Sequence, residues 1–253
     1  MANVTQLKHL EHLEDEMLNY GVEGCIASVN FLKELRKMLG CDNSTGFMQT
    51  KWDGAPSVVC GTDPLNGMFF VGTKSVFAKN SKACYDDVDV DLYYEGDLAE
   101  KLKYSLKYFS TLGIQGIVQG DLLFTTDVKR ETVNGEKLYT FTPNTITYGI
   151  PVDHPIGVAT SKAKIGVVFH THYRGTDFQT MQAVAGAKVK GSIEVLSVDN
   201  DTPMDRVGLN HSEEVLFDKY VANIEKMCAA SGDFLDELTT LSGTAGDAKW
   251  LSL

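Results

Sequence analysis

The stretch Thr50-Lys51-Trp52-Asp53-Gly54 stands where the sequence changes from helical to strand-like patterning, and the rest of the chain is interpreted around it. An apolar, β-prone run follows over residues 55–60 and ends at the turn residues Gly61 and Asp63-Pro64. A lysine, a spacer, an aspartate and a glycine that lead into a strand can present a nucleophilic amine beside a phosphate site. The amine must be neutral to react, and nearby cations or desolvation favour that form. A surface turn of the same composition is the alternative interpretation.

Composition limits the class of protein. The chain has 253 residues, of which 43% are hydrophobic and 23% charged, as in ordinary globular domains. No run approaches the roughly 20 apolar residues that a membrane span needs, and the N-terminus lacks a secretory signal pattern. The five cysteines are odd in number and never spaced as CxxC, which favours reduced thiols. We therefore expect an intracellular protein with no membrane partner.

The charge distribution is uneven. A net charge of −11 argues against nonspecific binding of nucleic acid over the whole surface. A local basic groove is still compatible with the sequence, because lysines cluster over residues 74–82, 162–164 and 188–190. The acidic residues concentrate elsewhere, over residues 86–97 and in the last 60 residues.

Apolar periodicity predicts an α+β chain with helices at both ends. Residues 5–39 have the pattern of two helices separated at Asn19-Tyr20-Gly21, and the second helix is expected to end at Gly40. Helical spacing returns from Val215 onward, and the chain stops on apolar residues, as the start of a region not present in this chain would. The expected segments are an N-terminal helical segment (1–45), a central domain (46–200) and a C-terminal helical segment (201–253).

Strand patterns dominate the central domain. Residues 48–52 and 57–60 are expected to be extended, and residues 68–71 are expected to pair antiparallel with 57–60, which would bring Lys74 close to Lys51. Asn134-Gly135 predicts a hairpin turn. The remaining expected elements are a helix over 98–109 and strands over 117–124, 131–133, 138–141, 145–150, 165–172 and 193–198.

Polar residues within two of these strands are candidate site residues. Asp121 lies in an otherwise apolar strand, where an acid is costly unless it is paired, hydrogen-bonded or bound to metal. A purely structural hydrogen-bonding role is the alternative. His170 and His172 are two residues apart and are expected to project from one face of their strand, but no third ligand completes a zinc site.

Lys51-Trp52-Asp53-Gly54 resembles the KxDG motif of the covalent nucleotidyltransferases, the superfamily of ATP- and NAD-dependent polynucleotide ligases and messenger-RNA capping guanylyltransferases. In that superfamily the lysine attacks the α-phosphate of the nucleotide, forms a lysyl-nucleotide phosphoramidate and releases pyrophosphate. Gly120-Asp121-Leu122 resembles the GEL-type strand of the family, with aspartate in place of glutamate. The resemblance implies a ligase-type, ATP-grasp-like domain built mainly from antiparallel sheets.

The resemblance also implies a role for each candidate residue. Lys51 would be the catalytic nucleophile, and Asp121 would hold Mg²⁺ or a ribose hydroxyl. Phe169 best fits the aromatic residue that stacks on the base, with Tyr148 and Phe141 as alternatives. The residues implied in nucleotide binding are Thr50, Trp52, Asp53, Gly54, Lys74, Phe169, Lys188 and Lys190, the last two as a late Lys-x-Lys motif.

Two features of the superfamily are not found in the sequence. The acid that precedes Gly-Val-Val in the later metal motif is missing, because Ile165 stands at that place. No oligonucleotide-binding domain is visible either. These departures leave open whether turnover occurs.

The function implied by the resemblance is that of an ATP- and Mg²⁺-dependent ligase that forms lysyl-AMP at Lys51 and passes AMP to the 5′-phosphate of an RNA or DNA end. A capping-type guanylyltransferase and a non-catalytic phage structural or nucleic-acid-binding protein on the same fold are the alternatives. The stretches KWDGAPSVV, QGDLLF, FTPNTITY and GVVFHTHY also resemble a group of ligase-like proteins of tailed phages, found chiefly in marine phages. That resemblance covers residues 5–180 and implies kinship rather than an activity, with a location in the host cytoplasm.

Overall fold

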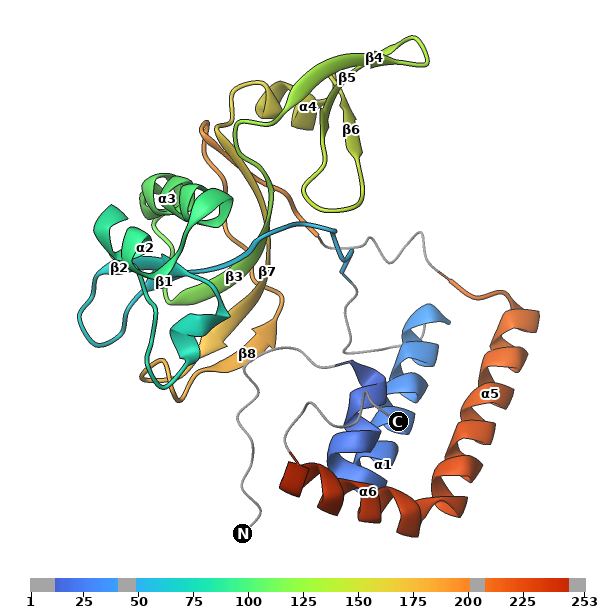
Figure 1. The fold of residues 1–253 in the computed structure, drawn as a ribbon. Helices are drawn as coiled ribbons and strands as arrows, with labels where there is room; N and C mark the ends of the chain where they lie inside the picture. Colours follow the sequence, from blue (N-terminus) through green and yellow to red (C-terminus); the bar gives the residue numbers. More distant parts are fainter. Residues whose placement is uncertain (1–11, 41–48, 201–207, 246–253) are drawn as a thin grey trace. The chain divides into compact units, whose positions relative to one another are not determined.

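The structure is a computed structural model that describes residues 12–40, 49–200 and 208–245. These residues belong to two compact units, one over Gln49–Asn200 and one made by the helices at the two ends of the chain. The protein is a mixed α+β protein with mainly antiparallel sheets and helices at both ends, in agreement with the sequence (Figure 1). The sequence treated the terminal helices as separate segments, whereas the structure groups them into one unit.

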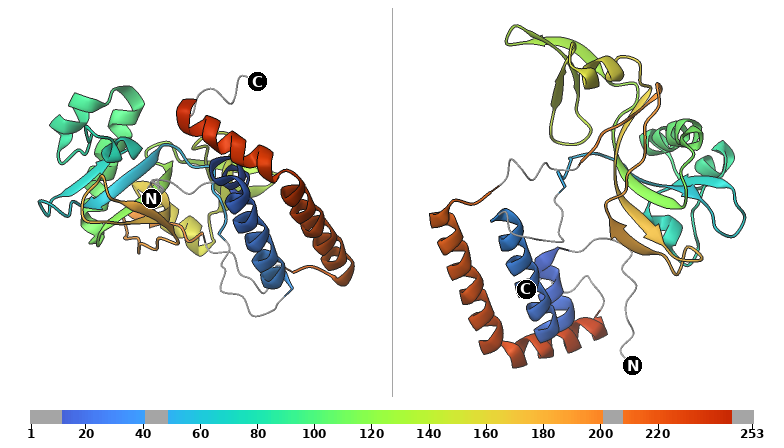
Figure 2. Two further views of the ribbon diagram at one scale, coloured as in Figure 1. Left: turned by 90° about the horizontal axis from the view of Figure 1, so that it is seen from below. Right: turned by 180° about the vertical axis from the view of Figure 1, so that it is seen from behind.

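A six-stranded sheet organises the Gln49–Asn200 unit (Figures 1 and 2). The antiparallel strands follow the order β2-β1-β3-β7-β8, and β9 pairs in parallel with the start of β7. The strands β3 and β7 are buried along most of their length, which suits their central position. The six strands are β1 (Ser57–Thr62), β2 (Phe69–Gly72), β3 (Ile117–Phe124), β7 (Ile165–Arg174), β8 (Gln182–Ala185) and β9 (Val195–Ser197).

Helices α2 (Asp87–Tyr93) and α3 (Gly96–Phe109) lie on one face of this sheet (Figure 1). In α3, Leu102 and Phe109 are fully buried at helical spacing, against alternate residues of the central strands such as Val118 and Leu122. The other residues of those strands therefore point to the opposite face, where the polar candidates are found. Two short 3₁₀ helices, η1 (Lys74–Phe77) and η2 (Ser110–Leu112), complete this region.

A second, three-stranded sheet is formed by β4 (Lys129–Val133), β5 (Glu136–Phe141) and β6 (Tyr148–Pro151), followed by α4 (Pro155–Thr160). The predicted hairpin is confirmed: Asn134 and Gly135 have positive φ angles of 51° and 84°, as a two-residue hairpin turn requires. A cluster that includes Phe124, Phe141 and Val168 packs this sheet against the large one.

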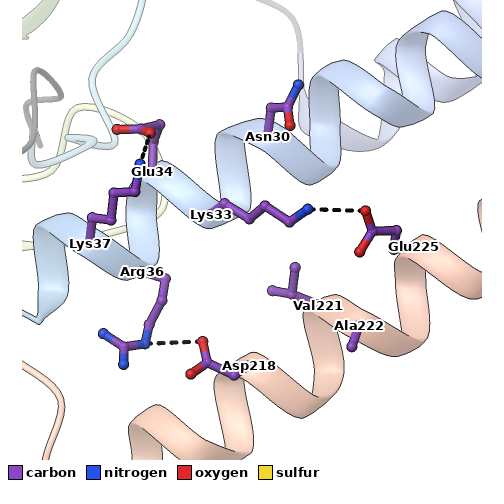
Figure 3. A pocket seen from close by; sticks show the side chains of 9 residues that line it. All are labelled: Asn30, Lys33, Glu34, Arg36, Lys37, Asp218, Val221, Ala222 and Glu225. Atoms are coloured by element: carbon purple, nitrogen blue, oxygen red, sulfur yellow. Dashed lines mark hydrogen bonds and ion pairs between the residues drawn. The ribbon is translucent and has the colours of Figure 1, made fainter.

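The helical unit consists of α1 (Leu13–Leu39), α5 (His211–Ala230) and α6 (Gly232–Ala245). The predicted break is present, because Gly21 has φ 59° and ψ −130° inside α1, and the helix ends at Gly40 as expected. Figure 3 shows the groove between α1 and α5, where Lys33 pairs with Glu225 and Arg36 with Asp218. None of the described helices is long and apolar enough to cross a membrane.

Some expected elements differ in the structure. Residues 50–56 are not in a strand, and Met48 lies outside the described residues. Strand β6 begins at Tyr148 rather than at residue 145, because the preceding loop is held by hydrogen bonds to Asp53. The short elements α4 and β8 had no sequence pattern long enough to predict them.

Candidate functional site

The Gly54 end of the Lys51–Gly54 segment packs directly on strand β3 at Asp121. The backbone N–H of Ala55 donates to the Leu122 carbonyl over 2.9 Å. A Cβ atom at Gly54 would lie only 2.6 Å from the Cβ of Asp121 and 2.9 Å from the Leu122 carbonyl oxygen. Glycine is therefore needed at this position for the close approach of the two segments, which are far apart in the sequence.

Asp53 ties the segment to the loop that precedes β6. Its carboxylate accepts hydrogen bonds from the Asn144 side chain (2.8 Å) and from the backbone N–H groups of Thr145 (2.8 Å) and Ile146 (3.0 Å). The Asn144 amide, followed by the two N–H groups and with a smaller contribution from Lys51, lowers the pKa of Asp53. The ionised carboxylate thus organises a polar loop beside Lys51.

The residues on either side of Lys51 are held in place. The Trp52 ring packs against Tyr148 with centroids 4.9 Å apart, and the Tyr148 hydroxyl accepts a 2.8 Å hydrogen bond from the backbone N–H of Asp53. The N–H of Thr50 donates to the Asn200 carbonyl over 2.7 Å. The Lys51 side chain itself is exposed. A solvent-accessible amine therefore extends from an anchored backbone.

Asp121 lies beside His170, a neighbour that the sequence did not predict. The β3–β7 register shifts so that Gln119 lies opposite Thr171 and Gly120 opposite Phe169, which makes His170 the extra residue of a β-bulge. The Nε2 atom of His170 lies 3.4 Å from Oδ1 of Asp121, and its Nδ1 atom lies 2.8 Å from Oγ1 of Thr171. Both side chains are about three-quarters buried, with 25% and 24% exposed.

A row of polar groups continues from Asp121 along the same face of the sheet. Gln119 donates to Oγ of Ser57 over 2.8 Å and accepts from the Tyr173 hydroxyl over 2.5 Å. Burial raises the pKa of Tyr173, so its hydroxyl stays protonated and can donate. Ser57 lies opposite Asp121 in the β1–β3 pairing. The polar groups of Gln119, Ser57 and Tyr173 are thus hydrogen-bonded to one another, on the face of the sheet that carries Asp121.

Phe169 is not at this site. It lies opposite Gly120, is only 2% exposed, and packs edge-to-face on Phe109 of α3 with centroids 5.5 Å apart. Its ring therefore has no face free to stack on a base. Phe141 is equally buried, whereas Tyr148 lies beside the Lys51–Gly54 segment. The sequence gives the order of these aromatics but not the side of the sheet to which each points.

The two histidines do not share a face. His172 lies opposite Val118, which belongs to the core under α3, whereas His170 contacts Asp121 on the other side. The prediction from strand alternation was wrong because the bulge interrupts the alternation at His170. Desolvation and, to a smaller degree, the charge of Arg174 lower the pKa of His172.

The other predicted lysines lie at the edges of the sheet. The antiparallel β1–β2 pairing is confirmed, and Lys74 follows the end of β2 in an exposed position at the start of η1. Lys188 and Lys190 are exposed, and they alternate with Ala187 and Val189, which pack in the core on the α3 side. The N–H of Gly186 donates to the His170 carbonyl over 2.9 Å, so this lysine segment starts beside the candidate site.

The residues present do not form a complete metal cage. Within the described parts of the chain, no three His, Cys, Asp or Glu side chains are grouped to hold a metal ion. Ile165, at the place of the missing acid, is fully buried. Asp121 is a hard oxygen ligand, and Mg²⁺ is commonly bound by one or two carboxylates together with substrate phosphates. Asp121 can therefore supply one carboxylate ligand to such an ion, and any further ligands would have to come from elsewhere.

The fold and site define an α+β protein in which the segment that carries the exposed Lys51 packs, through Gly54, on the strand-borne carboxylate of Asp121. The profile of a family of unknown function, DUF6267, matches residues 3–251, and the chain belongs to that family. No curated protein and no solved structure matches the chain.

Proposed function

We propose that the protein is a covalent nucleotidyltransferase of the polynucleotide-ligase type. The observation that carries this proposal is the close packing of Gly54 on Asp121, because it joins the lysine segment to the strand carboxylate. The mainly antiparallel sheets, with α3 covering only one face of the large sheet, are compatible with a ligase-type domain. The proposal stands on this geometry together with the sequence motif.

In the proposed reaction, the neutral Lys51 amine attacks the α-phosphorus of ATP. A bond from Nζ to phosphorus forms, the bond to pyrophosphate breaks, and the amine proton passes to solvent. A 5′-phosphate oxygen of an RNA or DNA end then attacks the same phosphorus and releases the lysine. Positioning and charge neutralisation are the main demands of such a transfer.

The other residues would bind and orient the nucleotide. Phosphate charge would be neutralised by Lys74, Lys188 and Lys190. The Asp121 carboxylate would accept a hydrogen bond from a ribose hydroxyl or bind Mg²⁺, and Mg²⁺ would supply further charge neutralisation. Asp53 holds the polar loop beside Lys51. With Phe169 buried, Tyr148 is the aromatic candidate at the base position.

Incubation with α-³²P-labelled ATP and Mg²⁺, followed by denaturing electrophoresis, tests the proposal. We expect covalent label on the wild-type chain, none on Lys51→Ala or Lys51→Arg, and none after chelation of Mg²⁺. Lys162→Ala, at another exposed lysine, is the matched control and should keep the label. Equal labelling of wild type and Lys51→Ala would contradict the proposal, and preferential labelling by GTP would favour a guanylyltransferase.

A non-catalytic binding protein on this fold is the second candidate. The observation that favours it is Ile165, which places a fully buried apolar side chain where the superfamily has a metal-binding acid. This candidate predicts that the wild-type chain binds ATP without any covalent label. The same assay, combined with equilibrium binding of ATP, therefore separates the two functions.

A further inference from the structure

His170 is in contact with the candidate site although it lies outside the KxDG and GEL-type motifs. As the extra residue of the bulge, it is placed on the Asp121 side of the sheet, where regular alternation from Thr171 would not put it. Bulges are frequent beside active sites because they redirect a side chain. We infer that His170 is a positioning residue that holds the Asp121 carboxylate in the orientation needed to bind the nucleotide. The role assigned to His170 rests on the proposed nucleotidyl transfer.

The hydrogen-bonding state of the His170 ring supports this role. Nδ1 lies 2.8 Å from Oγ1 of Thr171, a residue that is 2% exposed. When the threonine hydroxyl donates to Nδ1, the ring proton is on Nε2. In the described part of the chain, Nε2 is shielded from solvent and has no hydrogen-bond partner. The Oδ1 atom of Asp121 lies 3.4 Å from Nε2.

In that tautomer, one carboxylate oxygen of Asp121 faces a buried N–H group. A small rotation of the carboxylate closes that contact into a hydrogen bond, and a buried donor gains from being paired. The pairing fixes the plane of the carboxylate and leaves Oδ2 for the ribose hydroxyl or the Mg²⁺ of the nucleotide. A partner that orients a ligating carboxylate typically changes binding or activity by about 10–100-fold when it is removed.

A double-mutant cycle tests the inference, with the initial rate of ATP labelling as readout. We expect His170→Asn to lower the rate by about 10–100-fold. His170→Gln should retain much of the wild-type rate. The side-chain NH₂ group of glutamine lies farther from the backbone than that of asparagine, at about the position of Nε2 in histidine. In an Asp121→Asn background, His170→Asn should have little further effect, because His170 acts through the Asp121 carboxylate.

His172→Asn is the matched control, since His172 lies two residues along the same strand on the other face. It should label like the wild type, and the melting temperature of each variant should identify any that fails to fold. If His170→Asn unfolds, His170→Ala takes its place in the cycle with Asp121→Asn, because it also removes the ring N–H. Fully multiplicative effects of the two substitutions, or a His170→Asn rate equal to that of His172→Asn, would overturn the positioning role. A wild-type chain that takes no label removes the proposed function and the role of His170 with it.

Discussion

Single residues of the opening motif have separate physical tasks. Gly54 permits the close contact with Asp121, whereas Asp53 binds the loop before β6 through three hydrogen bonds. The sequence identified both residues, but their partners could not be read from it. Asn144 lies about ninety residues away from Asp53, and nothing in a single sequence connects two such positions.

Asp53 gives a prediction about pH. Its pKa is lowered in the folded protein, so its contribution to stability is present above the unfolded value of about 3.9 and is lost as pH falls through the folded value. Asp53→Asn removes an acceptor from the loop and should destabilise the protein near neutral pH. We expect the difference in unfolding free energy between wild type and Asp53→Asn to shrink as pH falls below about 4.

Urea denaturation at a series of pH values measures that difference. Asp153→Asn, at an exposed aspartate of the same unit, is the control and should change stability little at any pH. A wild-type advantage that stays constant down to pH of about 3 would show that the carboxylate charge of Asp53 is not responsible.

At the scale of elements, the longer patterns were predictable and the irregular ones were not. The sequence correctly predicted strands β3 and β7 from their apolar runs, helix α3 from its apolar spacing and the hairpin from Asn134-Gly135. Each of these patterns is local in the sequence. The bulge at His170 depends on how β7 aligns with β3, which is a tertiary property. The same limit explains why Phe169 was expected at the site and is found in the core under α3.

Helix α1 gives a prediction at this scale. At its break, Gly21 interrupts the helical backbone, and the N–H of Val22 donates to Oδ1 of Asp236 in α6 over 3.0 Å. A side chain from another helix thus caps the second half of α1. Asp236→Ala should destabilise the protein by about 1 kcal/mol, the usual cost of losing a helix cap.

Thermal unfolding followed by circular dichroism at 222 nm measures the cost of Asp236→Ala. Glu237→Ala changes the neighbouring exposed acid and should leave the melting temperature nearly unchanged. Equal losses in the two variants would indicate a general effect of charge on α6 rather than loss of the cap.

At the scale of the molecule, the two units differ in charge and in burial. Residues 49–200 contain 15 basic and 17 acidic residues, so most of the net charge of −11 lies in the sequence outside them. Among residues whose burial is described, the helical unit buries three hydrophobic side chains, those of Cys25, Val29 and Val221. The Gln49–Asn200 unit contains three hydrophobic clusters of its own. A near-balanced charge also makes this unit the better place for an anionic nucleotide.

A fragment of residues 49–200 is therefore expected to fold alone and to retain the labelling reaction. It is one continuous segment with its own core, and it contains every candidate residue, from Thr50 to Lys190. We expect a cooperative urea transition and a labelling rate per molecule within about threefold of the full chain, since a rate ratio of that size corresponds to less than 1 kcal/mol of activation free energy. The same fragment with Lys51→Ala is the control. If the full chain is labelled and the folded fragment is not, a group required for labelling lies outside residues 49–200. In that case the core and the candidate residues of the fragment would be present but insufficient.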